Sequence, residues 1–193
     1  MNSQTKGACN GDLVLPLNES REEWLKSKIR DIPDFPKPGI VFKDLTTLLK
    51  DAEAFQFVID VLVEKCKGYQ PEVIAGIEAR GFILASAIAY ALNIGFVPVR
   101  KPGKLPYKVE RLQYDLEYGS DSVEVHIDAV SKGERTILID DLLATGGTAT
   151  AAHKLLTKVG ADVVATGFIV ELSFLAGRQR LDSQGQVFSL ISY

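Results

Sequence analysis

The chain has 193 residues, of which 46% are hydrophobic and 24% charged, with a formal net charge of −3. This is the composition of one globular domain, and the slightly negative charge gives no sign of a nucleic-acid partner. Two cysteines exclude a disulfide-rich scaffold and favour a reducing, cytoplasmic location, and no run approaches the ~18 apolar residues of a membrane-spanning helix.

Residues 1–18 are polar and lack the basic start and long apolar stretch of a secretory signal. We therefore predict a flexible N-terminal extension, followed by a single domain over residues 19–193. The first predicted helix spans residues 19–30. The next segment, DIPDFPKPGIVF, has three prolines and a glycine, which predict a shaped loop. Residues 52–67 place apolar side chains at helical spacing, and Gly68 ends that helix.

Strands and helices alternate in the rest of the chain. The apolar pattern predicts helices at residues 82–92 and directly after residue 148, and strands at residues 73–77, 95–99, 122–127, 136–140, 163–170 and 186–193. The strand at 136–140 has no polar alternation, which is typical of a strand covered on both faces. The alternation predicts an α/β fold with a mostly parallel central sheet and helices on both faces.

The segment over residues 100–119, RKPGKLPYKVERLQYDLEYG, is charged and fits neither the helical nor the strand period well. Structureless loops of this length are uncommon in compact domains unless they are functional. We interpret the segment as a flexible flap over a site; the alternative is a solvated excursion between edge strands.

The strongest chemical signal is TILIDDLLATGGT, residues 136–148. Asp140 and Asp141 close a strand, at the edge of the sheet where ligands of α/β proteins bind. The following turn enters a helix, whose free backbone N–H groups and dipole attract a phosphate; its residues are Ala144, Thr145, Gly146, Gly147 and Thr148. Carboxylates directly beside a phosphate would repel it, so we expect an intervening sugar whose hydroxyls the two acids bind. A plain strand–turn–helix connection is the alternative.

A second candidate loop is GIEARG, residues 76–81. It has the glycine spacing of a phosphate-binding P-loop, but Phe82 stands in the place of the lysine. Arg80 lies at the tip of this turn, where its guanidinium suits a second, doubly charged phosphate group. The alternative is a surface arginine paired with Glu78.

Five blocks occur in an order that resembles the type I phosphoribosyltransferases, and among them the adenine phosphoribosyltransferases. They are FPKPGIVFKDLT at 35–46, EARGF at 78–82, RKPGKLP at 100–106, LEYG at 116–119 and DDLLATGGT at 140–148. The resemblance implies the type I phosphoribosyltransferase fold with an N-terminal hood and a flexible flap. It also implies purine salvage by a homodimer: adenine and phosphoribosyl pyrophosphate give AMP and pyrophosphate, with Mg²⁺ held mainly by substrate oxygens.

The same resemblance implies roles for individual residues. The 144–148 turn would bind the 5′-phosphate, and Asp140 and Asp141 the ribose hydroxyls. Adenine would contact the main chain of Val41 and Lys43 in the hood. It would lie between the side chains of Phe42 and Leu142. Glu117 would transfer a proton at adenine N7, with Arg80 as the second catalytic residue. Pyrophosphate would be bound by Arg80, Arg100, Lys101, Lys104 and Tyr118.

Two alternatives stay open on the sequence alone. One is a phosphoribosyltransferase for another base, which would be expected to lack the FPKPGIVFKD hood. The other is a non-catalytic regulatory module that binds AMP, although such a module has no use for a pyrophosphate site.

Overall fold

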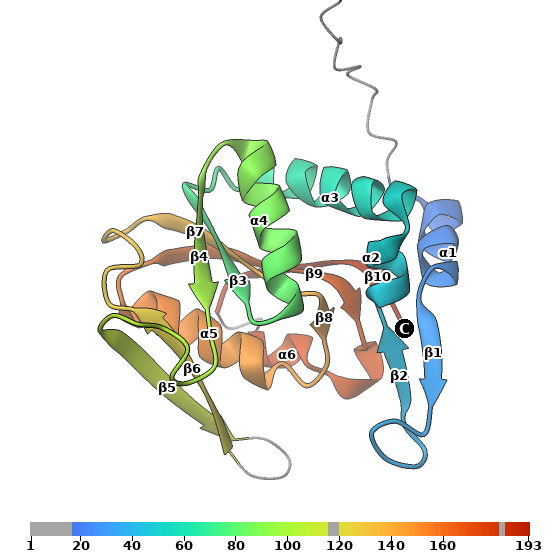
Figure 1. Ribbon diagram of the computed structural model, residues 1–193. Coiled ribbons are helices and arrows are strands. Elements are labelled where there is room, and N and C mark those ends of the chain that lie inside the picture. Colours follow the sequence, from blue (N-terminus) through green and yellow to red (C-terminus); the bar gives the residue numbers. More distant parts are fainter. Residues whose placement is uncertain (1–16, 116–119, 182–183) are drawn as a thin grey trace, which may run out of the picture.

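A computed structural model describes residues 17–115, 120–181 and 184–193 of the chain, and its centre is a parallel sheet (Figure 1). The strand order is β10-β9-β7-β3-β4, and β8 pairs with the end of β9. The strands are β3 (Val73–Ile77), β4 (Gly95–Val99), β7 (Arg135–Ile139), β8 (Leu142–Leu143), β9 (Asp162–Glu171) and β10 (Gln186–Ser192). The predicted parallel sheet is confirmed, with the strand predicted at 122–127 lying outside it.

Helices cover both faces of the sheet, as predicted. One hydrophobic core forms beneath α1 (Glu19–Ser27), α2 (Thr46–Lys50), α3 (Ala52–Lys67) and α4 (Arg80–Leu92). A second core forms beneath α5 (Gly147–Lys158) and α6 (Arg178–Leu181) on the other face. Strand β7 serves both cores, because Ile137 and Ile139 face the first and Leu138 the second. Burial on both faces is why this strand reads as a continuous apolar run.

The proline-rich segment near the N-terminus forms a hairpin rather than the predicted loop. Strand β1 (Arg30–Pro33) pairs antiparallel with β2 (Val41–Asp44), and the helix predicted to reach residue 30 ends at Ser27. Asp34 and Gly39 both adopt positive φ angles of 57° and 84°, and Asp34 Oδ1 accepts a hydrogen bond of 2.7 Å from Gly39 N. Glycine and aspartate tolerate this left-handed geometry, which closes the turn. We call β1, β2 and their connection the hood.

Part of the segment predicted as a flap, residues 100–119, forms a strand that the sequence pattern did not predict. Residues 109–115 form β5 (Val109–Asp115), which pairs antiparallel with β6 (Ser120–His126) in a hairpin separate from the central sheet. The pairing is stabilised because Val123 and Val125 are buried against α5, with Leu112 partly buried beside them. The last four residues of the predicted flap, 116–119, lie outside the described residues. So does most of the predicted N-terminal extension, residues 1–16.

The two hairpins project on opposite sides of the molecule in Figure 1, with β8, α5 and α6 between them in this view.

Two turns lie at the carboxyl edge of the sheet, because each follows the end of a parallel strand: the one after β7 and the one between β3 and α4. In an open α/β sheet this edge is where ligands bind. No helix among the described residues has the length and apolar character needed to span a membrane.

Candidate functional site

The turn that follows β8 is built around two close backbone approaches. Gly146 has φ +78°, and a Cβ atom there would lie 2.6 Å from the carbonyl oxygen of Gly177. A Cβ on Gly177 would lie 2.0 Å from the carbonyl oxygen of Ala144. Both positions therefore require glycine, and together they press the loop before α6 against the turn. The sequence patterns did not reveal this role of Gly177, because it lies 31 residues after Gly146, the turn residue it contacts.

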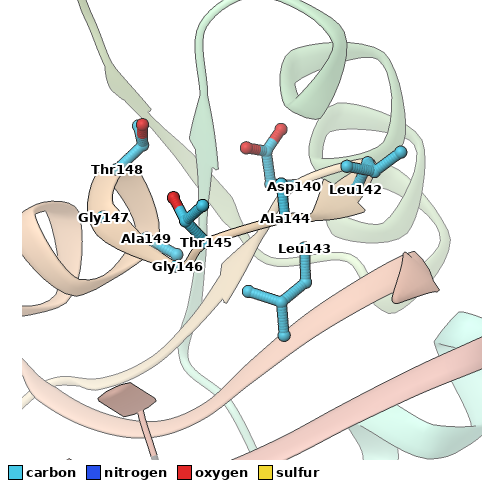
Figure 2. A pocket seen from close by; sticks show the side chains of 9 residues that line it. All are labelled: Asp140, Leu142, Leu143, Ala144, Thr145, Gly146, Gly147, Thr148 and Ala149. Carbon is cyan, nitrogen blue, oxygen red and sulfur yellow. The ribbon is translucent and has the colours of Figure 1, made fainter. Parts of the chain in front are cut away.

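This turn encloses a small cavity of about 100 Å³ at the start of α5. Figure 2 shows the oxygens of Asp140, Thr145 and Thr148 on one side of the loop, while Leu143 points to the opposite side, where it is buried. The lining comprises Asp140, Leu142, Leu143, Ala144, Thr145, Gly146, Gly147, Thr148 and Ala149. Backbone N–H groups at a helix start, two hydroxyls and a dipole give this cavity the properties of an anion site.

The two aspartates differ in environment although they are adjacent. Asp141 is buried, and its main-chain carbonyl accepts hydrogen bonds of 3.1 and 3.0 Å from Ile169 and Val170 in β9. Asp140 lines the cavity, and its Oδ1 accepts a hydrogen bond of 2.9 Å from Asp141 N. Burial and the negative charge of Asp141 raise the pKa of Asp140 well above its ordinary value. Asp140 is thus poised to bind a group that donates hydrogen bonds or carries positive charge.

Arg80 lies next to this pair. Its Nε donates to Asp141 Oδ2, and its side chain is still 43% exposed. The contact is possible because Gly81 brings α4 against the end of β7: a Cβ on Gly81 would lie 2.8 Å from the Ile139 carbonyl and 3.0 Å from Asp140 Oδ1. The alternative pairing of Arg80 with Glu78 is not found in the described part of the chain. The structure therefore unites the two candidate phosphate loops in one site.

Glu78 instead anchors the basic loop at residues 100–104. It accepts two hydrogen bonds of 3.3 Å from the Arg100 guanidinium and one of 2.9 Å from Lys101 N. The hydrogen bond from Lys101 N, with support from Arg100, lowers the pKa of Glu78 although partial burial opposes it. Arg100 Nη1 also donates to the Lys104 carbonyl at 3.0 Å. Glu78 and Arg100 thus hold the main chain of this basic loop beside the β3–α4 turn that carries Arg80.

The side chain of Lys101 turns toward the β5–β6 hairpin. It forms an ion pair with Asp121 and lies 3.3 Å from the Tyr114 hydroxyl. Neither Tyr114 nor Asp121 was singled out from the sequence: Tyr114 lies in β5, which was not predicted as a strand, and Asp121 lies just before the strand predicted at 122–127. The two predicted flap residues, Glu117 and Tyr118, lie outside the described residues.

Two of the four predicted base-binding residues, Val41 and Lys43, line a larger cavity of about 570 Å³ between the hood and the C-terminal segment. Leu142 lines the phosphate cavity instead, and Phe42 is not among the residues that line the larger one. Its lining is mainly apolar and comprises Asp31, Gly39, Ile40, Val41, Lys43, Thr145, Leu172, Phe174, Leu175 and Tyr193. Thr145 links this cavity to the phosphate loop, since it lines both. Phe42 packs edge-to-face against Phe35 with ring centroids 5.2 Å apart. Cavities of this volume and lining suit a small aromatic ligand.

No group of three or more His, Cys, Asp or Glu side chains in the described residues could hold a metal ion. The donor set nevertheless suits Mg²⁺, which binds through one or two carboxylates together with substrate phosphate oxygens. Asp140 is the carboxylate at the cavity that could contribute.

Comparisons with known proteins agree with this geometry. Residues 46–190 match the family described as phosphoribosyl transferase domain. An adenine phosphoribosyltransferase from Solibacter usitatus is 57% identical over 169 residues, which are 88% of this chain and 97% of that protein. The crystal structure of an adenine phosphoribosyltransferase from Thermoanaerobacter pseudethanolicus has a TM-score of 0.85 at 51% identity, covering 89% of this chain and 99% of that one. A Trypanosoma brucei adenine phosphoribosyltransferase, solved with AMP, pyrophosphate and ribose-5-phosphate, has a TM-score of 0.81 at 27% identity, covering 88% of this chain and 78% of that one.

Proposed function

Since the chain belongs to the phosphoribosyl transferases, and among them to the adenine phosphoribosyltransferases, we propose that it serves purine salvage by making AMP. In this reaction the 5-phosphoribosyl group moves from phosphoribosyl pyrophosphate to adenine, and pyrophosphate leaves. The observation that carries the proposal is the junction of the phosphate loop, Asp140 and Arg80 at one edge of the sheet.

The proposal assigns one part of phosphoribosyl pyrophosphate to each group of residues. The 5′-phosphate would bind in the cavity at the start of α5, where backbone N–H groups and the hydroxyls of Thr145 and Thr148 donate hydrogen bonds. Asp140 and Asp141 would accept hydrogen bonds from the ribose hydroxyls. Pyrophosphate would lie toward Arg80 and the basic loop, because charge-assisted hydrogen bonds to phosphate are strongest from arginine.

The chemistry follows from where charge develops. Displacement at the anomeric carbon leaves positive charge on the ribose while pyrophosphate departs, so fixed cations must stabilise the leaving group. Arg80, Arg100, Lys101 and Lys104 are the candidates, with Tyr118 predicted to assist. Glu117 would move the proton at adenine N7. Bound Mg²⁺ would neutralise pyrophosphate charge, held mainly by the substrate's own oxygens.

Adenine would enter between the hood and the phosphate loop. Val41 and Lys43 of hood strand β2 line the cavity between hood and C-terminal segment, and their main-chain groups would contact the base. Main-chain groups can read the edge of a purine without any charged side chain, so this arrangement suits an uncharged base. Phe42 and Leu142 remain the proposed partners for the two faces of the ring.

We further propose that the protein is a cytoplasmic homodimer, as the resemblance predicts. Helix α4 supports a dimer because it exposes large hydrophobic side chains, with Ile83 44% and Tyr90 90% exposed. Light scattering on the purified protein would test this directly, since a mass of 21.1 kDa would indicate a monomer.

The deciding experiment is product analysis. The purified protein is incubated with Mg²⁺, phosphoribosyl pyrophosphate and, in separate reactions, adenine, hypoxanthine, guanine, uracil or orotate. AMP from adenine and no nucleotide from the other bases is the expected outcome. Nucleotide from a different base would overturn the assignment of the hood. AMP binding without any turnover would point to the regulatory alternative.

A further inference from the structure

The Tyr114 hydroxyl lies where the β5–β6 hairpin meets the phosphate loop. It is 3.0 Å from the hydroxyl of Thr148, which lines the phosphate cavity. It is also 3.1 Å from Asp121 Oδ2 and 3.3 Å from Lys101 Nζ. The ring packs partly buried against the second core, so the position of the hydroxyl is fixed by its surroundings. No role for Tyr114 follows from the five sequence blocks, since it lies outside all of them.

The protons available to this cluster can be counted. Hydrogen bonding to Asp121 and Tyr114 raises the pKa of Lys101 although burial opposes it, and Lys101 lowers the pKa of Asp121 against the same opposition. Both groups are therefore charged near neutral pH: Lys101 only donates and Asp121 only accepts. Tyr114 and Thr148 have one proton each.

Two arrangements satisfy this count. In the first, Tyr114 donates to Asp121, and Thr148 donates to Tyr114. The charged carboxylate favours this arrangement because hydrogen bonds to ionised acceptors are the stronger ones. In the second, Tyr114 donates to Thr148, and the Thr148 proton is free to point into the cavity, while Lys101 and the main-chain N–H of Ser122 stabilise Asp121. A phosphate in the cavity favours the second arrangement for the same reason, because it provides a charged acceptor for Thr148.

We propose that Tyr114 is a positioning residue that directs the Thr148 hydroxyl proton toward the 5′-phosphate. The inference rests on the proposed function, because it takes the cavity at the start of α5 as the phosphate site. When phosphate binds, the chain runs from Tyr114 through Thr148 to the phosphate, and each hydrogen bond in it polarises the next. The β5–β6 hairpin thereby contributes to phosphate affinity without touching the ligand.

The test is a double-mutant cycle with ribose 5-phosphate as the probe, titrated calorimetrically. The variants are Tyr114→Phe, Thr148→Val and the double substitution. Tyr114→Phe keeps the buried ring and removes the hydroxyl, and we expect about a threefold to tenfold loss of affinity, the range for one neutral hydrogen bond. In the Thr148→Val variant, Tyr114→Phe should cause no further loss of affinity, because the Thr148 hydroxyl that links Tyr114 to the phosphate is already absent.

Tyr107→Phe is the matched control, since Tyr107 is 55% exposed and precedes the same hairpin. It should bind ribose 5-phosphate like the unaltered protein. A second variant, Asp121→Asn, removes the charge that competes for the Tyr114 proton, so its affinity should stay equal or rise.

Three outcomes would overturn the inference: unchanged affinity in Tyr114→Phe, additive losses in the cycle, or a loss in Asp121→Asn as large as that in Tyr114→Phe. The last outcome would mean that the geometry of the hairpin, and not the direction of the Thr148 hydroxyl proton, determines the affinity for ribose 5-phosphate. If the unaltered protein does not bind ribose 5-phosphate, the assignment of the phosphate site is wrong and this inference with it, while product analysis still decides the proposed function.

Discussion

Replacing Asp44 by asparagine should destabilise the hood and make the protein less dependent on pH in acid. Asp44 ends strand β2 and is 8% exposed. Its Oδ1 accepts hydrogen bonds of 2.9 and 2.7 Å from the main chain and hydroxyl of Thr46, and its Oδ2 one of 3.1 Å from Arg30 Nε. The Thr46 hydroxyl and Arg30 lower the pKa of Asp44 from its ordinary 3.8 to about 2. One carboxylate thus joins both hood strands to α2.

The size of the effect follows from that pKa. A decrease from 3.8 to about 2 corresponds to about 2.5 kcal/mol of folding free energy, at about 1.4 kcal/mol per pH unit. Because the Arg30 side chain is 59% exposed, water screens the pair, and we expect about 1.5 kcal/mol. A folded-state pKa below the unfolded one stabilises the protein fully above pH 3.8, and the stabilisation is lost as pH falls toward 2. About half should remain near pH 3.

Urea unfolding of Asp44→Asn at pH 7 and at pH 3 measures this difference, and thermal unfolding at pH 7 should show a Tm lower by about 3–6 °C. Asp31→Asn is the matched control on the paired strand. Its ion pair with Lys43 is 2.7 Å long, but the Asp31 side chain is 53% exposed, so its loss should cost less than about 0.5 kcal/mol. Equal stability of the two variants, or a difference independent of pH, would refute the reasoning.

Three further substitutions or reactions test other parts of the structure. Asp140→Asn should raise stability at pH 8 and lose that advantage below pH 4, because a raised folded-state pKa destabilises the folded protein above the ordinary value; urea unfolding at both pH values checks this. Gly177→Ala should weaken ribose 5-phosphate binding at least about tenfold in calorimetry, since its Cβ would lie 2.0 Å from the Ala144 carbonyl oxygen. The control Gly68→Ala should bind normally, because its Cβ would lie at an ordinary 3.5 Å from the Lys65 carbonyl oxygen. Burial raises the pKa of the Cys66 thiol to about 12, so iodoacetamide should leave it unmodified at pH 8 until urea unfolds the protein; mass spectrometry of the peptide decides.

Apolar periodicity predicted the central sheet and its helices well, because these elements bury whole faces. The helix predicted at residues 52–67 has those bounds in the structure, and the strand predicted at 136–140 is displaced by one residue from β7, which spans Arg135–Ile139. The phosphate-loop geometry was also predictable, because Gly146 supplies the left-handed turn within the motif itself. In these segments the information that fixes the structure is local in the chain.

The hairpins were missed for a physical reason. Strand β5 carries charged residues at Glu110 and Arg111, so its sequence lacks a clean alternation. What holds it is pairing with β6 and the packing of Leu112 against the second core. The hood similarly depends on a turn made by Asp34 and Gly39 across five residues. Pairing partners and close backbone approaches are long-range features that no local pattern encodes.

The ion pair between Arg80 and Asp141 neutralises the Asp141 carboxylate, and a ligand that binds Arg80 must replace this pairing. Asp141 is 4% exposed, and removing its cation without compensation would leave a buried charge unpaired, at a cost of several kcal/mol. Under the proposed function, pyrophosphate draws Arg80 away, and ribose hydroxyls must then donate to Asp141. Pyrophosphate alone would therefore bind less tightly, because it would pair with Arg80 and leave the Asp141 carboxylate without a hydrogen-bond donor. A ligand that carries both pyrophosphate and ribose hydroxyls pairs with Arg80 and also donates hydrogen bonds to Asp141. This is the chemical reason to expect phosphoribosyl pyrophosphate, rather than either fragment, as the preferred occupant of this site.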